Sequence, residues 1–314
     1  MSTAGAIFLL TALAGVVTEE LSTCLSELST FNPNMLQLPR LRKLRLTGGC
    51  DFGLGLEGSF SHLHHLSSLQ LRELSWVTEE ESLGGLTELR DLCFVAHNDC
   101  LGDSLRLAGL SQATGLTSLT LGLASADFDS EALPPALPLL EQFSVSGRAA
   151  AELASGLNWW GFPQLRSLTL SHGCHCDESL DLVPLVELPR LEVLDIGGCT
   201  LEDLPNLGLG MPVMARLQKL TVNDAWLSDN RAWLDSLPFV KTLHLTGEPY
   251  GLGGASDTHW EMLLESLVRA LPSLETLEVD AYEVMAVGDE GTGLRRSFEF
   301  LLTMRPELDV FGPD

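Results

Sequence analysis

Basic residues are scarce in this sequence of 314 residues. Eighteen lysines and arginines stand against 43 aspartates and glutamates, which gives a formal net charge of −25 at pH 7. Phosphate backbones and anionic lipid surfaces repel a chain of this charge. The composition therefore argues against nucleic acid and membrane as general partners, and it favours a protein partner.

The motifs that usually carry catalysis are also missing. The sequence contains no Gly-x-Ser-x-Gly elbow, no Walker loop and no His-Glu-x-x-His pair. Its serines and aspartates are scattered, and no two carboxylates stand at a spacing that suggests an acid and a base. We therefore expect no enzymatic activity, no catalytic residues and no bound cofactor.

Two segments imitate ligand sites but lack what the chemistry needs. The Gly53–Gly58 segment fits the spacing of a dinucleotide fingerprint, but the next expected strand follows too soon to leave room for the required helix. The His172–Asp177 segment crowds two histidines and two cysteines into one loop. A structural zinc site takes four ligands, usually as two separated pairs. We expect neither nucleotide binding nor a metal site.

Features of secreted proteins are lacking as well. The seven cysteines are odd in number and follow no disulfide framework, and no Asn-x-Ser/Thr glycosylation acceptor occurs. Both observations indicate a reducing compartment. The expected location is the cytoplasm, with the nucleus and cytoskeletal or ciliary structures as alternatives.

No apolar run reaches the roughly 20 residues that a membrane helix needs. The apolar stretch at 6–17 is shorter, and no basic residue precedes Arg40, whereas a signal peptide starts with positive charge. Apolar residues recur instead at spacings of three and four, which predicts an amphipathic capping helix within residues 1–34. They are Leu10, Leu13, Val17, Leu21, Cys24, Leu25 and Leu28.

What the sequence has in abundance is a repeated phrase, Leu-x-x-Leu-x-Leu. Ten copies follow one another at intervals of 23 to 27 residues, with a last interval of 34. A fixed period in this range predicts an α/β solenoid over residues 35–314, with a parallel sheet of about 10–11 strands. The copies begin at Leu41, Leu66, Leu89, Leu116, Leu140, Leu165, Leu191, Leu217, Val240 and Leu274, and an eleventh, truncated strand is expected at 308–311.

The fullest copy runs from Leu191 to Leu201 and carries Cys199 where the leucine-rich repeat family has Asn or Cys. The chain resembles that family, and most closely its cysteine-containing and ribonuclease-inhibitor-like subclasses, which include the repeat halves of F-box proteins. The resemblance implies a horseshoe with a concave parallel sheet and a helical or irregular convex side. It also implies protein binding through the concave face. Residues 1–34 lack the Leu-Pro opening of an F-box, so the resemblance covers the repeats alone.

The repeat register predicts which side chains face outward, because alternate residues of a strand point to opposite sides. The outward positions are basic in the first repeats, small and polar in the middle, and acidic in the last repeats. They contain almost no aromatic residues. The candidate protein-binding residues are Lys43, Arg45, Arg72, Thr120, Ser144, Ser146, Thr169, Ser171, Asp195, Asn223, His244, Glu278 and Asp280.

The uninterrupted repeats and the missing catalytic motifs favour a protein-interaction scaffold or recognition module. One alternative is a fixed structural subunit of a large assembly, such as a ciliary or ribosomal complex. Another is a substrate-receptor role by analogy with F-box proteins. The repeat pattern does not identify the partner.

Overall fold

The structure is a computed structural model of the whole chain. The described residues are 19–25, 28, 30–49, 54–77, 83–96, 108–122, 136–147, 150, 156–171, 180, 182–185, 188–199, 201, 213–247, 257–280 and 301–311. The chain divides into two compact units, unit 1 (Met1–Leu165) and unit 2 (Arg166–Asp314).

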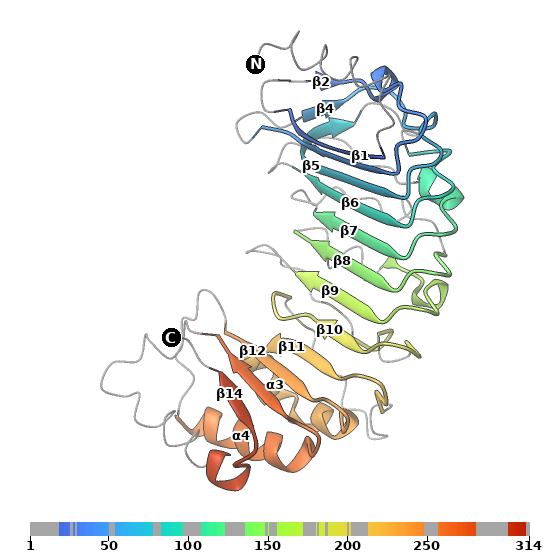
Figure 1. Cartoon of the computed structure of the whole chain (residues 1–314). Helices are drawn as coiled ribbons and strands as arrows, with labels where there is room; N and C mark the ends of the chain where they lie inside the picture. The colour runs from blue at the N-terminus through green and yellow to red at the C-terminus, as the bar shows by residue number, and fades with distance from the viewer. Residues whose placement is uncertain are drawn as a thin grey trace. The chain divides into compact units, whose positions relative to one another are not determined.

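In unit 1, every copy of the phrase forms a strand that begins two residues after its first leucine. The strands pair in parallel and in register (Figure 1). Buried side chains at one position of each strand therefore stack on one another, namely Leu44, Leu69, Leu92, Leu119 and Phe143. Burial alternates along each strand because successive side chains point to opposite sides of the sheet. The strands are β3 (Lys43–Thr47), β5 (Ser68–Val77), β6 (Asp91–Ala96), β7 (Ser118–Gly122) and β8 (Gln142–Ser146).

The predicted helix does not extend over residues 20–24, which form strand β1 (Glu20–Cys24). This strand pairs in parallel with β3 and places Leu21 beside Leu44 and Thr23 beside Leu46. It therefore occupies the position of a further repeat strand. The prediction of a helix is wrong here, because Leu21 is a strand residue in the repeat register. Further along the predicted segment, Thr30–Phe31 is a strand and Pro33–Met35 a 3-10 helix, while residues 1–18, 26, 27 and 29 lie outside the described residues.

Two short strands that follow β1 in unit 1 belong to the same sheet. Strand β2 (Thr30–Phe31) pairs with β4 (Leu54–Leu56), and β4 also pairs with the second half of β5. Between them the 3-10 helix η2 (Pro33–Met35) begins at Asn32, whose side chain accepts a hydrogen bond from the Asn34 amide. These elements cover the core beneath Leu36 and Phe60, both fully buried.

The far side of unit 1 is covered by 3-10 turns and irregular chain. Helix η4 (Ala108–Gln112) lies before β7, and η6 (Trp159–Gly161) lies after β8. The rings of Phe143, Trp159 and Phe162 pack together with centroid separations of 5.9 to 6.4 Å. Aromatic packing of this kind fixes the end of the repeat that follows β8.

Unit 2 repeats the same arrangement with six parallel strands in its described part. Leu168, Leu194, Leu220, Leu243 and Leu277 stack in register. The predicted eleventh strand is confirmed, because Val310 pairs beside Leu277. The strands are β9 (Ser167–Ser171), β10 (Val193–Asp195), β11 (Lys219–Asn223), β12 (Thr242–Thr246), β13 (Thr276–Val279) and β14 (Asp309–Phe311).

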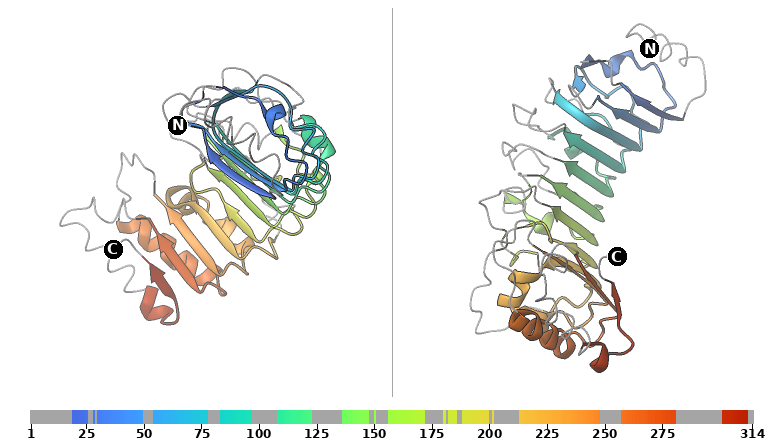
Figure 2. Two further views of the ribbon diagram at one scale, coloured as in Figure 1. Left: turned by 45° about the horizontal axis from the view of Figure 1, so that its top comes forward. Right: turned by 90° about the vertical axis from the view of Figure 1, so that its left-hand side faces the viewer.

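Helices cover one side of the sheet in unit 2 (Figure 2). They are α3 (Asp224–Asp229), the 3-10 helix η7 (Arg231–Ser236) and α4 (Asp257–Ala270). Leu263, Leu264 and Leu267 of α4 are fully buried, each contributing about 1.5–3 kcal/mol relative to exposure. Both units are therefore built as leucine-rich repeat solenoid, with a parallel sheet on one side and helical or irregular chain on the other.

Candidate protein-binding surface

The outward side of the unit 1 strands presents side chains in straight rows. The middle row runs Arg45, Gln70, Cys93, Thr120 and Ser144, and each residue is paired in register with the next. Neighbouring strands in a sheet stand about 4.8 Å apart, so the row is a fixed ladder of contacts. We call the outward residues of β3 and β5 to β8 the unit 1 face.

Charge on the unit 1 face is only partly neutralised. The ammonium group of Lys43 lies 2.5 Å from a carboxylate oxygen of Glu20 on β1, and this hydrogen bond raises the pKa of Lys43. Arg45 and Arg72 are exposed, and no carboxylate among the described residues pairs with either guanidinium. Of the three basic residues predicted here, two therefore remain available to a partner.

Apart from Gln70, Gln142 and the exposed carboxylate of Asp91, the rest of the unit 1 face carries mostly small side chains. Thr120, Ser144 and Ser146 are half-buried between the strands on either side, and Cys93 is a free thiol in the same row. Small residues leave room for another backbone to approach the strands closely. The face is thus a flat polar surface with its positive charge at β3 and β5.

On the outward side of unit 2, the middle row runs Thr169, Asp195, Thr221, His244 and Glu278. The predicted acidic residues are present on this side, but Asp195 and Asp280 already have partners within the unit. His244 Nε2 lies 2.9 Å from Asp280 Oδ1, and Asp195 Oδ1 accepts a hydrogen bond of 3.3 Å from the Gly197 amide. Glu278 and the half-buried Ser171 complete the predicted set in this unit.

A turn after β10 crosses part of this face and covers β11. The hydroxyl of Thr246 on β12 donates a hydrogen bond of 2.7 Å to the Gly197 carbonyl. Thr221, which lies between them on β11, is only 5% exposed. Asn223 is 9% exposed, and its side-chain oxygen accepts from the Trp226 amide as the cap of α3. The sequence places Asn223 on the binding face, whereas its contacts are those of a helix cap.

Of the two segments that imitate ligand sites, the structure describes residues 54–58 of the first. Within the Gly53–Gly58 segment, Leu54–Leu56 is strand β4 and no helix follows it directly. The His172–Asp177 segment lies outside the described residues. Within the described part of the chain, no three His, Cys, Asp or Glu side chains come together as a metal-binding group. No helix there combines the length and apolar character that crossing a membrane requires.

Sequence reasoning missed two features that shape the surface. Strand β1 brings Glu20 beside Lys43, and its repeat phrase is concealed because Thr23 stands where Leu46 stands in the next strand. The turn over β11 depends on Gly197, where a Cβ atom would lie 2.7 Å from Thr246 Cγ2. A glycine at an outward position of the repeat register was the signal in the sequence that could have indicated this turn.

No family model matches the sequence, and no curated protein matches it. Among solved structures, 32 chains match. One is a chain of the crystal structure of the mouse RP105/MD-1 complex, with a TM-score of 0.48 and 16% sequence identity. The match covers 93% of this chain and 50% of that chain, so this chain spans about half the length of the other.

Proposed function

We propose that this chain is a non-enzymatic protein-interaction module that binds a protein partner through the outward faces of its strands. The observation that carries this proposal is the pair Arg45 and Arg72, two exposed guanidinium groups without a carboxylate partner among the described residues. Nearby Lys43 and His65 both pair with glutamates. Arginine is among the residues that most often dominate binding energy at interfaces.

The scaffold around these arginines supports the same function. Strands β3, β5, β6 and β7 of the unit 1 face are each paired with a neighbouring strand on both sides, and apolar side chains are buried beneath them. A partner that binds a surface ordered in advance loses less conformational entropy than one that must order its target. The partner we expect carries carboxylates that can reach Arg45 and Arg72.

We also propose that the repeats are of the cysteine-containing kind. Cys199 is buried, and its thiol donates a hydrogen bond of 3.0 Å to the carbonyl of Leu170 in the preceding repeat. A side chain that satisfies a carbonyl of the neighbouring repeat helps to hold two repeats together. A reducing location and the cytoplasm remain part of this proposal, because Cys199 acts here as a thiol.

Charge reversal tests the proposal directly. We expect the Arg45→Glu/Arg72→Glu variant to lose a partner that co-purifies with the wild-type chain from native extract, because a carboxylate would then face the carboxylates of the partner. The Arg40→Glu/Arg90→Glu variant is the matched control, since it changes the net charge equally in unit 1 away from the face. Thermal unfolding of both variants should remain close to that of the wild type.

Charge reversal at Asp195, Glu278 and Asp280 should reduce co-purification of the partner less, because Asp195 and Asp280 already have partners within unit 2. If neither set of variants changes any co-purifying protein, the proposed function is wrong. If the control variant loses the same partner, binding depends on net charge and not on the unit 1 face.

A further inference from the structure

Basic residues gather along one border of the repeats in this acidic chain. Three positions of each phrase lie where the chain enters the strand. They are the residue before the first apolar residue of the phrase and the two residues after it, and we call this border the leading edge. These three positions in ten phrases hold nine of the 18 basic residues but only five of the 43 acidic ones. The basic ones are Arg40, Arg42, Lys43, Arg90, Arg166, Arg190, Arg216, Lys219 and Lys241.

In unit 2, backbone hydrogen bonds place the leading-edge residues directly above one another. The amide of Glu192 donates to the Arg166 carbonyl, that of Gln218 to Glu192, that of Lys241 to Gln218, and that of Glu275 to Lys241, each at 2.8 Å. Two ion pairs follow, Arg166 to Glu192 at 2.7 Å and Lys241 to Glu275 at 2.8 Å. Both carboxylates of this edge are therefore neutralised by a neighbour.

Neutralisation of the carboxylates leaves Arg216 and Lys219 as exposed positive charges on the same edge. Neither has an ion pair with any described residue. Beside them Phe239 is 50% exposed, on the segment that enters β12. These residues belong to one stretch of surface from β10 to β13.

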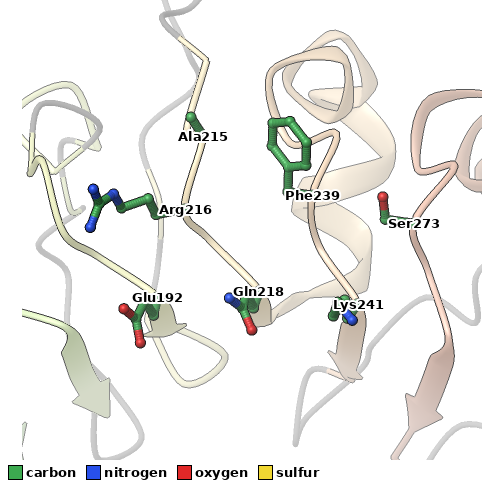
Figure 3. Close-up of a pocket in the computed structure, with 7 residues that line it drawn as sticks. All are labelled: Glu192, Ala215, Arg216, Gln218, Phe239, Lys241 and Ser273. Carbon is green, nitrogen blue, oxygen red and sulfur yellow. The ribbon is translucent and has the colours of Figure 1, made fainter.

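An open pocket of about 370 Å³ lies on this stretch. Figure 3 shows its lining side chains on successive segments that enter the strands, with Arg216 and Phe239 on neighbouring segments and Gln218 and Lys241 below them. The pocket thus combines an aromatic ring, an amide and a guanidinium group with the carboxylate of Glu192 and the ammonium group of Lys241, which are ion-paired with Arg166 and Glu275. This combination suits a ligand with both an apolar group and a carboxylate.

We propose that the leading edge of unit 2 binds an acidic segment of a partner protein that carries an aromatic or large aliphatic side chain. Arg216 can take a carboxylate by two parallel hydrogen bonds, and Lys219 supplies a second charge. Phe239 offers the apolar contact. This surface is separate from the unit 1 face of the proposed function, so either can fail without the other.

Charge favours a peptide over a nucleic acid at this edge. A peptide can place single carboxylates at Arg216 and Lys219 and leave Glu192 and Glu275 in their existing ion pairs. A continuous phosphate backbone would run past both glutamates, on a chain whose net charge is −25. A partner segment with separated acidic residues avoids that repulsion.

The test is binding of a fluorescent peptide array to the full chain. The peptides carry a central Trp, Leu or Ser flanked by aspartates, and a matched set is flanked by lysines. We expect the Asp-flanked peptides with Trp or Leu to bind best, and we expect added NaCl to weaken their binding. Arg216→Gln/Lys219→Gln should weaken that binding about fivefold or more. The control Arg231→Gln/Arg269→Gln changes the net charge equally and should leave the affinity unchanged.

Phe239→Ser should abolish the preference for Trp or Leu over Ser at the centre while the salt dependence remains. Equal binding of Lys-flanked peptides, or equal losses in the control variant, would overturn the proposal. So would tighter binding of a single-stranded DNA probe than of any acidic peptide. If the wild-type chain self-associates and the Arg216→Gln/Lys219→Gln variant does not, the proposal is wrong, because a second copy of the chain then occupies the edge.

Discussion

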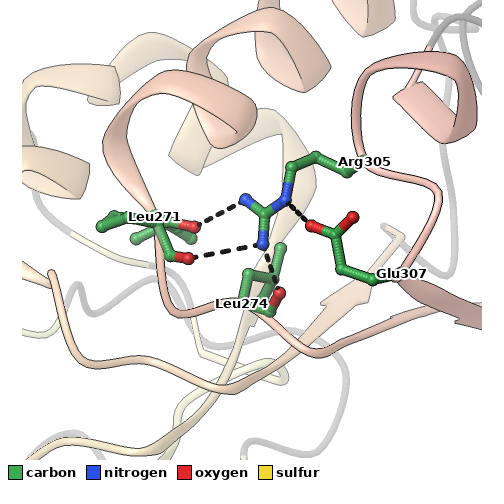
Figure 4. A network of polar contacts seen from close by, with 5 residues as sticks. Leu271, Leu274, Arg305 and Glu307 are labelled. Carbon is green, nitrogen blue, oxygen red and sulfur yellow. Dashed lines mark hydrogen bonds and ion pairs between the residues drawn. The ribbon is translucent and has the colours of Figure 1, made fainter.

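Arg305 connects the last repeats of unit 2 through its guanidinium group. Its Nη1 donates to the Leu271 carbonyl at 3.2 Å and its Nη2 to the Leu274 carbonyl at 2.7 Å, while Nε donates to Glu307 (Figure 4). Leu271 follows the last residue of α4, where unpaired carbonyls and the helix dipole favour a positive charge. One side chain therefore ends the helix and positions the turn before β14.

This contact predicts an altered titration of Glu307. The hydrogen bond from Arg305 holds the pKa of the Glu307 carboxyl below its ordinary value of 4.5. Because the folded pKa is depressed, the stabilising effect is present above pH 4.5 and is lost as the pH falls. An NMR titration should therefore show Glu307 ionising below 4.5. In the Arg305→Gln variant its pKa should rise towards that value, and no change would refute the contact.

At the scale of single elements, the turn after β10 decides how much of the unit 2 face is open. Gly197 lies against β11 and β12, where a Cβ atom would be 2.7 Å from Thr246 Cγ2 and 2.9 Å from Thr221 Cγ2. Contacts this short cannot be kept, so any side chain at position 197 must displace the turn or the strands. The turn stays in place because residue 197 has no side chain.

We therefore expect Gly197→Ala to destabilise the chain by about 1–3 kcal/mol, the usual cost of adding a methyl group to a packed site. Urea unfolding measures this difference. Gly115→Ala is the matched control, because its Cβ would meet only the Leu89 carbonyl oxygen at an ordinary 3.7 Å. Adding Thr246→Ala to Gly197→Ala should recover part of the loss. Equal stability of Gly197→Ala and Gly115→Ala would contradict the packing described for this turn.

The elements show which parts of the fold the sequence could predict. Leucines at fixed spacing predicted β3 and the strands from β5 to β14, because every repeat buries the same positions against its neighbours. They did not predict the short strand β4. Strand β1 was mistaken for a helix, since Leu21, Leu25 and Leu28 also fit a spacing of three and four. Parallel pairing with β3, a tertiary contact, determines the conformation of this segment.

The candidate binding surface was less predictable than the fold. The register predicted that Arg45, Arg72 and Thr120 face outward, and in the structure the two arginines are exposed and Thr120 is half-buried. Such a prediction is possible because alternation within a strand is a local property. Asn223 was assigned to the surface by the same rule, but α3 begins at the next residue and uses its side chain as a cap. The pairing of Lys43 with Glu20 joins strands that are distant in sequence, so no local pattern could reveal it.

For the whole molecule, the distribution of charge is more informative than its total. A net charge of −25 describes a protein that repels most acidic partners at long range. The exposed arginines Arg45, Arg72 and Arg216 nevertheless lie outside the ion pairs of the described residues. On an acidic chain, these exposed arginines are the places where an acidic partner can bind.

The central claim is that a protein partner lies on the unit 1 face, and site-specific photo-crosslinking tests it most directly. A photoreactive amino acid at Gln70 stands in register between Arg45 and Cys93, and one at the exposed Ser111 of η4 serves as the control off the face. We predict that Gln70 yields a covalent adduct with one protein in native extract, that Arg45→Glu/Arg72→Glu removes the adduct, and that Ser111 yields none. Equal adducts from both positions, or none from Gln70, would contradict the account.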